Sequence, residues 1–239
     1  SKNKFDTRLI NISDETGLLA IQGPNAIKVL QKLTKTDLSK IKYYDFTKGS
    51  IAEMDNIIIS ATGYTGSGGF ELYCQKDQTE RIWDLVMEAG VEFNICPCGL
   101  GSRDTLRLEM GYCLYGNDID DRTSPLEAGL GWITKLNKEG DFPSKHIFVK
   151  QKKDGLMTQL VAFKMKEKRV PRHDYEVFNN EGLKIGRVTS GTQSPTLDYP
   201  IGLAYVSAFH NKAGTEIYIK MGTKLLEAEV VKLPFVNIT

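Results

Sequence analysis

The sequence predicts an α+β protein with two parts: a mixed helix-and-strand portion at residues 1–150 and a small antiparallel barrel or sandwich at residues 151–239. In the first part, strand-like apolar runs alternate with segments in which apolar residues recur at helical spacing. After Asp154, short strand-like runs follow one another closely with turn residues between them, as in small antiparallel β domains. Lys and Gln cluster near residues 150–155 and mark the expected boundary.

Size and composition are those of a globular protein. The chain has 239 residues, and a compact chain of this length buries about 70–75% of its extended surface. Hydrophobic residues make up 41% and charged residues 26%, which argues against wholesale disorder. The net charge of +1 argues against a general binder of nucleic acid. No apolar run approaches the roughly 20 residues of a membrane-spanning helix, so we expect no membrane association.

The four cysteines are too few and too irregularly spaced for a disulfide scaffold, and they favour a reducing compartment; they are Cys74, Cys96, Cys98 and Cys113. Cys96-Pro97-Cys98 lacks the C-x-x-C spacing of zinc sites, and we expect no bound metal. Residues 1–8 show no signal-peptide pattern. The start at Ser1 indicates that processing or truncation made this N-terminus.

Three segments predict helices. The clearest begins with the capping pattern of Asp77 and Glu80 and ends at Gly90. Its apolar residues fall at positions i, i+3, i+4 and i+7, which are Ile82, Leu85, Val86 and Ala89. A second helix is expected at residues 102–110, with Gly111 as its terminator. Pro24 suits the first position of a third.

Strands are expected where β-branched or alternating apolar residues are bounded by turn residues. In the first part these runs are residues 9–12, 18–21, 42–50, 56–61, 70–74 and 130–136. In the second part they are residues 159–165, 175–178, 184–189, 201–206, 215–219 and 226–233. Asn179-Asn180-Glu181-Gly182 lies between two of these runs and predicts a hairpin.

The glycine-rich segment Gly63-Tyr64-Thr65-Gly66-Ser67-Gly68-Gly69 resembles a phosphate-binding loop only superficially. No Lys-Ser or Lys-Thr pair follows it, so it is not a P-loop. A dinucleotide fingerprint would need glycine at position 71 and a helix after it, where we expect a strand. Two interpretations stay open: a flexible turn, or a loop that lets a flat ligand approach the backbone, with Tyr64 and Glu71 beside it.

Glu71 lies between the apolar residues Phe70 and Leu72 in a predicted strand. Such a carboxylate either faces solvent or is specifically paired. If it is buried, it can accept two parallel N–H bonds from a planar donor. A guanidinium is one such donor, and the 2-amino-4-oxo edge of a pterin is another.

Mixed charges mark the helix expected at residues 102–110. Arg103 and Arg107 are four residues apart and share a face. This fits either a solvated face with local ion pairs, or an Arg103 that reaches into a cleft to hold a carboxylate or carbonyl. A break at Gly111 would free Tyr112 to turn back toward Arg103.

The remaining polar residues show no catalytic pattern. Asp118, Asp120 and Asp121 lack the spacing of an EF-hand, so this acidic cluster predicts a solvated loop. The three histidines, His146, His173 and His210, stand singly. No Ser or Cys nucleophile is paired with a base.

Several separated strings agree on one family. In the first part they are Leu19-Ala20-Ile21-Gln22-Gly23-Pro24, Gly63-Tyr64-Thr65-Gly66, Gly69-Phe70-Glu71-Leu72, Gly99-Leu100, Arg103-Asp104-Thr105-Leu106-Arg107-Leu108-Glu109, Leu114-Tyr115-Gly116-Asn117-Asp118 and Pro125-Leu126-Glu127-Ala128-Gly129-Leu130. In the second they are Gly186-Arg187-Val188-Thr189-Ser190-Gly191, Ser194-Pro195-Thr196-Leu197 and Pro234-Phe235. In this order, over essentially the whole chain, they resemble the T-protein, or aminomethyltransferase, family of the glycine cleavage system.

The resemblance implies a ferredoxin-like, T-protein-type α+β folate-binding domain followed by a small antiparallel C-terminal β-barrel. It implies an enzyme that takes the aminomethyl group carried by the lipoylated H-protein, releases ammonia and converts tetrahydrofolate to 5,10-methylenetetrahydrofolate. By the same resemblance, Glu71 would hold the pterin edge, while Tyr64, Arg103 and Tyr112 would line the folate site. The family is often monomeric, and the expected compartment is the bacterial cytoplasm or, alternatively, the mitochondrial matrix.

The chain departs from the family pattern in its extent, because it starts about one third of the way in. In the family, the preceding part holds a whole domain and the aspartate near the reacting folate nitrogen. We therefore assign no catalytic residue in this chain. Ser67-Gly68 also stand where the family often has Glu-Asp, which changes the charge of that loop.

Two related activities remain as alternatives. One is a non-enzymatic folate-binding protein that maintains iron–sulfur clusters and carries Lys-Gly-Cys-Tyr-x-Gly-Gln-Glu. The matching stretch here, residues 139–145, has no cysteine. The other is the folate-binding portion of a flavin-linked sarcosine or dimethylglycine oxidase, whose flavin domain would lie upstream.

Overall fold

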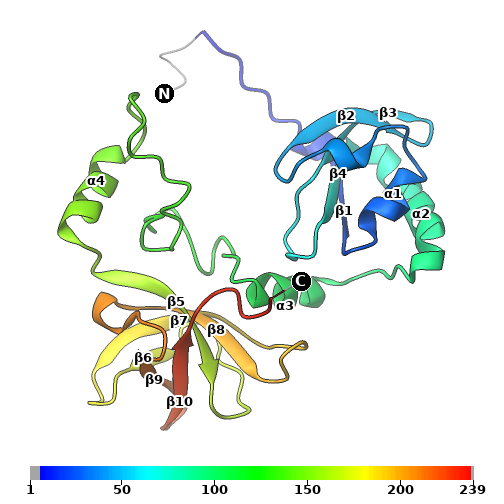
Figure 1. Cartoon of the computed structure of the whole chain (residues 1–239). Helices are drawn as coiled ribbons and strands as arrows, with labels where there is room; N and C mark the ends of the chain where they lie inside the picture. Colours follow the sequence, from blue (N-terminus) through cyan, green and yellow to red (C-terminus); the bar gives the residue numbers. More distant parts are fainter. Residues whose placement is uncertain (1–5, 238–239) are drawn as a thin grey trace. The chain divides into compact units, whose positions relative to one another are not determined.

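The computed structural model describes residues 6–237, and the chain divides into two compact units, residues 1–99 and 100–239 (Figure 1). Unit 1 contains an open sheet with two helices, and unit 2 contains a closed barrel and two further helices. The boundary expected near residues 150–155 falls at the end of helix α4 (Lys145–Asp154) and stays a prediction. Within residues 6–237, no helix has both the length and the apolar character needed to cross a bilayer.

Unit 1 is built on a four-stranded antiparallel sheet with strand order β1-β4-β3-β2 (Figure 1). Its strands are β1 (Thr16–Gln22), β2 (Phe46–Ile51), β3 (Met54–Ser60) and β4 (Gly69–Gln75). Side chains alternate between the two faces of a strand. Phe70, Leu72 and Cys74 of β4 are buried in a core shared with α1 (Ala26–Gln31) and α2 (Thr79–Gly90). Glu71 and Tyr73 therefore lie on the opposite face.

Helix α2 confirms the apolar stripe but not the predicted cap. Ile82 and Val86 are buried in the core of unit 1. The residues before the helix form a short 3₁₀ turn, Lys76–Gln78, and the N-cap residue Gln78 makes no side-chain capping bond. The helix ends at Gly90 as predicted; a short 3₁₀ turn (Val91–Phe93) follows it and is ended by Asn94, which adopts the left-handed conformation. Asn tolerates this conformation better than most residues do.

Unit 2 contains a closed six-stranded barrel in the order β10-β5-β8-β7-β6-β9 (Figure 1). The strands are β5 (Thr158–Met165), β6 (Glu176–Phe178), β7 (Lys184–Gln193), β8 (Pro200–Ser207), β9 (Glu216–Met221) and β10 (Lys224–Val231). Closure removes the exposed strand edges that a sandwich would keep. The barrel interpretation is therefore confirmed over the sandwich, and each of the six predicted runs overlaps one of these strands.

The hairpin predicted between residues 178 and 184 is confirmed. The Asn179 side chain accepts hydrogen bonds from the backbone N–H groups of Glu181 and Leu183, at 3.0 and 2.9 Å. This is the local bonding by which Asn stabilises turns. Strands β6 and β7 pair on either side of it.

Helix α3 (Leu100–Glu109) packs on the outside of the barrel through Leu108, which is fully buried. Leu108 contacts apolar side chains that include Ala162 of β5 and Leu203 of β8. The helix ends as predicted at Gly111, whose φ is +72°. The Gly111 N–H donates to Leu108 O at 2.8 Å, and the Tyr112 N–H donates to Arg107 O at 2.9 Å. These two bonds form a Schellman motif, which satisfies carbonyls at the helix end.

Two predicted strands are absent from the structure, and one helix was not predicted. Residues 9–12 form no strand, and their apolar side chains are exposed. An isolated strand leaves its backbone groups unpaired, so a short apolar run alone does not hold this conformation. Residues 130–136 instead make successive local turns, with backbone bonds from Ile133 to Leu130 and from Thr134 to Gly131. Helix α4 was missed because it is rich in lysine and has no buried residue.

Replacement of Gly111 by alanine is expected to destabilise unit 2. The new methyl group would lie 2.4 Å from the Leu233 side chain, and alanine is strained at this positive φ. We expect a loss of about 2–4 kcal/mol in the free energy of unfolding, measured by chemical denaturation. Gly116→Ala is the matched control, because its φ is also positive and nothing lies within 4 Å of the added atom. Equal losses in the two variants would contradict the steric part of this account.

Candidate functional site

In unit 1, the predicted ligand-binding residue Glu71 is half-buried on the sheet face that the helices leave uncovered. Ala20 of β1 and Ser60 of β3 are its neighbours across the sheet. The Thr62 hydroxyl donates a hydrogen bond to Glu71 Oε2. Glu71 is thus paired rather than free in solvent. A carboxylate accepts up to about four hydrogen bonds, so with the bond from Thr62 the Glu71 carboxylate can still accept two parallel N–H donors.

The glycine-rich loop that joins β3 and β4 is packed against Gln22 at the end of β1. Gln22 Nε2 donates to Thr62 O at 3.2 Å, and Thr65 Oγ1 donates to Gln22 Oε1 at 3.1 Å. A side chain at Gly63 would overlap Gln22 Oε1, since its Cβ would lie 1.8 Å away. The structure explains Gly63 by this close approach of Gln22 to the loop. Tyr64, the other residue predicted to line the folate site in unit 1, lies in this loop.

In unit 2, Arg103 lies on helix α3, and Tyr112 lies in the turn that ends this helix, directly after Gly111. Arg103 is exposed, and Tyr112 is half-buried. The predicted turn at Gly111 directs the chain back along the helix, because the Tyr112 N–H bonds to Arg107 O. Of the two interpretations of this helix, the solvated face is wrong for Arg107, whose side chain is only 2% exposed.

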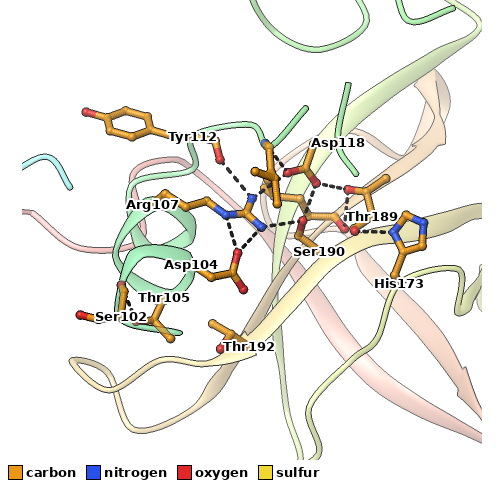
Figure 2. A network of polar contacts seen from close by, with 12 residues as sticks. Ser102, Asp104, Thr105, Arg107, Tyr112, Asp118, His173, Thr189, Ser190 and Thr192 are labelled. Atoms are coloured by element: carbon orange, nitrogen blue, oxygen red, sulfur yellow. Dashed lines mark hydrogen bonds and ion pairs between the residues drawn. The ribbon is translucent and has the colours of Figure 1, made fainter. Parts of the chain in front are cut away.

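The Arg107 guanidinium is the centre of a buried polar network in unit 2 (Figure 2). Its Nε and Nη2 donate to Asp104 Oδ1 at 2.8 and 2.7 Å. Its Nη1 donates to Asp118 Oδ2 at 2.7 Å and to Tyr112 O at 3.1 Å. Its Nη2 also donates to Ser190 Oγ at 2.9 Å. A guanidinium has five N–H donors, and these five bonds use all of them.

Asp118 is the buried counter-ion of Arg107, with a side chain that is 0% exposed. Besides Arg107, its Oδ2 accepts a bond from the Leu114 N–H at 2.8 Å. Its Oδ1 accepts bonds from the hydroxyls of Thr189 and Ser190 on β7. The prediction of a solvated acidic loop was therefore wrong for Asp118. A buried charge requires such compensation, because desolvation of an unpaired carboxylate costs several kcal/mol.

A second buried carboxylate, Glu109, ties the last turn of α3 to the connection between β7 and β8. Its Oε1 accepts from Ser194 Oγ at 2.5 Å and from the Thr196 N–H at 3.1 Å. Its Oε2 accepts from Thr196 Oγ1 at 2.9 Å. Its backbone oxygen accepts from the Phe235 N–H at 2.9 Å. Glu109 and Arg107 thus fix the same helix to the barrel through separate sets of partners.

Burial and nearby charge change the acidity of two side chains next to this network. Burial, followed by the negative charge of Asp118, raises the pKa of the Cys113 thiol to about 11. Burial is also the main cause that raises the pKa of the Tyr205 phenol above its ordinary value. The Tyr205 hydroxyl donates to the backbone oxygen of Asp118 at 2.9 Å. Both groups are neutral at pH 7.

Within the described part of the chain, no three His, Cys, Asp or Glu side chains are placed together so that they could hold a metal ion. Cys96 and Cys98 are exposed. The expectation that the protein binds no metal stays a prediction.

The comparisons with known proteins agree with the motifs. The family model described as the GCVT N-terminal domain matches residues 1–138, and the one described as the glycine cleavage T-protein C-terminal barrel domain matches residues 158–237. The chain belongs to the glycine cleavage T-protein family. The resemblance inferred from the sequence is confirmed, and so is the T-protein type of fold with its C-terminal barrel.

Bacterial aminomethyltransferases are among the most similar relatives. The one from Bacteroides thetaiotaomicron is 56% identical over 235 residues, which are 98% of this chain and 65% of the relative. The one from Halothermothrix orenii is 48% identical over 230 residues, 96% of this chain and 64% of the relative. The crystal structure of glycine cleavage system aminomethyltransferase T from Bartonella henselae matches with a TM-score of 0.85 and 30% identity, covering 92% of this chain and 60% of that one. The chain thus spans about two thirds of the length of these relatives.

Sequence reasoning missed the partners of Arg107. Asp118 was grouped with Asp120 and Asp121 because the three are close in sequence. Thr189 and Ser190 are buried hydroxyl side chains that need partners, but strand β7 is rich in polar residues and gives no sign in sequence that these two are buried.

The raised pKa of Cys113 predicts low reactivity toward iodoacetamide at pH 8, because the thiolate is the reacting form. We expect Cys113 to be alkylated at least about tenfold more slowly than the exposed Cys98, measured by mass spectrometry of proteolytic peptides. The unfolded chain is the control, in which the two rates should converge. Because the pKa is raised on folding, the stabilisation from the neutral thiol is complete at neutral pH and is lost as pH rises through about 11. Equal rates in the folded chain would refute the shift.

Proposed function

We propose that the protein to which this chain belongs is a tetrahydrofolate-dependent aminomethyltransferase of the glycine cleavage system. The observation that carries the proposal is the match over 98% of the chain to relatives named aminomethyltransferase, at identities above 50%. The half-buried, paired carboxylate of Glu71 is consistent with a site for a planar donor edge. The flavin-linked oxidase and the non-enzymatic folate binder are not favoured by these relatives.

In the proposed reaction, the carbon of the aminomethyl group is carried on a lipoyl sulfur of the H-protein. Loss of ammonia leaves this carbon as a sulfur-stabilised cation (a thionium, S=CH2+), which a nitrogen of tetrahydrofolate attacks. The carbon then leaves the sulfur, which becomes a thiol, and forms its second bond to the other folate nitrogen. The products are 5,10-methylenetetrahydrofolate, ammonia and the reduced lipoyl arm.

The contribution we assign to this chain is positioning. A nitrogen nucleophile held in a near-attack geometry gains much of its rate from orientation, without a covalent intermediate on the protein. We propose that Glu71 accepts the N–H groups of the pterin edge, and that Tyr64, Arg103 and Tyr112 line the folate site. The lipoylated H-protein is the proposed partner. We further propose a monomer in the bacterial cytoplasm, with the mitochondrial matrix as the alternative.

The assay that tests the proposed function uses the full-length natural protein, since this chain spans about two thirds of its relatives. Aminomethyl-lipoyl H-protein and tetrahydrofolate are supplied, and ammonia and 5,10-methylenetetrahydrofolate are measured. Formation of both products in equal amounts, dependent on tetrahydrofolate, is the expected result. No product from a folded protein that receives both substrates would refute the proposal.

Glu71→Ala is expected to weaken tetrahydrofolate binding by about 1.5–3 kcal/mol, the scale of a charge-assisted hydrogen bond. This corresponds to an increase in Kd of about 10- to 150-fold, measured by calorimetric titration. Glu53→Ala is the matched control, because this glutamate lies in the β2–β3 turn with a side chain that is 89% exposed. A Kd that stays within twofold of wild type in Glu71→Ala would rule out the assignment of the pterin edge.

A further inference from the structure

Arg107 is the residue of unit 2 that holds both polar backbone groups of Tyr112. The Tyr112 N–H donates to Arg107 O at 2.9 Å, and Tyr112 O accepts from Arg107 Nη1 at 3.1 Å. In Figure 2 the Tyr112 carbonyl points toward the guanidinium, while the ring extends away from the network. The backbone of Tyr112 is therefore fixed from one residue, and the ring is left to contact other groups.

The guanidinium itself cannot move without breaking buried bonds. Asp104 and Asp118 bond it from the helix and from the following loop, and Ser190 bonds it from β7. Asp118 is fixed in turn by the Thr189 and Ser190 hydroxyls. A shift of Arg107 would leave a charged group and several hydroxyls buried without partners, at a cost of several kcal/mol.

We propose that Arg107, held by Asp118, is a positioning residue that sets the place of the Tyr112 ring for tetrahydrofolate. This inference rests on the proposed function, in which Tyr112 lines the folate site. Arg107 does not touch the ligand in this account, and it acts through the backbone of Tyr112. Only an arginine can do this, because five bonds in one plane require the guanidinium, whereas a lysine ammonium has three donors.

The structure supplies a control for the alternative that the network only stabilises the fold. Glu109 is buried on the same helix, and its carboxylate bonds Ser194 and Thr196, which lie in the connection between β7 and β8. Glu109→Gln and Arg107→Lys should both lower the melting temperature. Only Arg107→Lys should change the folate site.

The test measures the Kd of tetrahydrofolate in the full-length protein, at a temperature where every variant is folded. We expect Arg107→Lys to raise the Kd about tenfold, and Glu109→Gln to leave it within twofold of wild type. Ser190→Ala removes one bond to Arg107 and is the milder variant if Arg107→Lys does not fold; we expect a rise of about two- to threefold. Similar Kd changes in Glu109→Gln and Arg107→Lys, or no change in Arg107→Lys and Ser190→Ala, would overturn the proposal.

A double-mutant cycle asks whether Arg107 acts through Tyr112. If it does, Arg107→Lys should add no more than a twofold loss of affinity in a Tyr112→Ala background. Full additivity of the two losses would overturn the proposed route.

The NMR resonances of the Tyr112 ring give a readout that does not depend on folate. We expect them to shift or broaden in Arg107→Lys and to stay unchanged in Glu109→Gln. Absence of tetrahydrofolate binding by the wild-type protein would refute the proposed function. In that case the ring resonances would still test whether Arg107 fixes the position of Tyr112. Unchanged resonances in Arg107→Lys would overturn this claim.

Discussion

The buried ion pair of Arg107 and Asp118 is the interaction on which the arrangement of unit 2 depends. It joins helix α3 and the loop that follows it to strand β7 of the barrel, which lies more than 70 residues further along the chain. A buried pair adds little net stability compared with apolar side chains of the same size, but removal of one partner leaves an uncompensated charge. The pair therefore specifies one position of α3 on the barrel. Leu108 supplies the apolar contact of that same interface.

In unit 1, the main feature is the position of one carboxylate, Glu71, on the sheet face that the helices do not cover. The alternation of β4 sends Phe70 and Leu72 into the core and Glu71 to the other face. Gln22 fixes the loop between β3 and β4: its amide N–H donates to Thr62 O, and its amide oxygen accepts from Thr65 Oγ1. In this position of the loop, the Thr62 hydroxyl bonds Glu71. The glycine at position 63 provides room for Gln22. Each unit thus presents its proposed ligand-binding residue from a rigid support.

Local patterns predicted much of the fold. Closely spaced β-rich runs predicted the barrel strands, and Gly111 predicted the end of α3, because these features depend on propensity and on turn conformation. The predictions failed where tertiary contacts decide. Residues 130–136 resemble a strand in composition but bond locally, and α4 has no buried stripe that would reveal it. Asp118 has the neighbours of a solvated residue in sequence, and its side-chain partners lie 11 to 72 residues away. For Glu71 the sequence indicated a paired carboxylate as one of two possibilities, while the bond from Thr62 required the structure.

The central claim is that Arg107 immobilises the backbone that follows helix α3. Hydrogen exchange of single amides, followed by NMR, tests it most directly in wild type and in Arg107→Lys. The account predicts that the Tyr112 and Leu114 amides are protected in wild type and exchange at least about tenfold faster in the variant, while amides of β9 and β10 keep their protection. Unchanged protection of Tyr112 and Leu114 in a folded Arg107→Lys protein would contradict it.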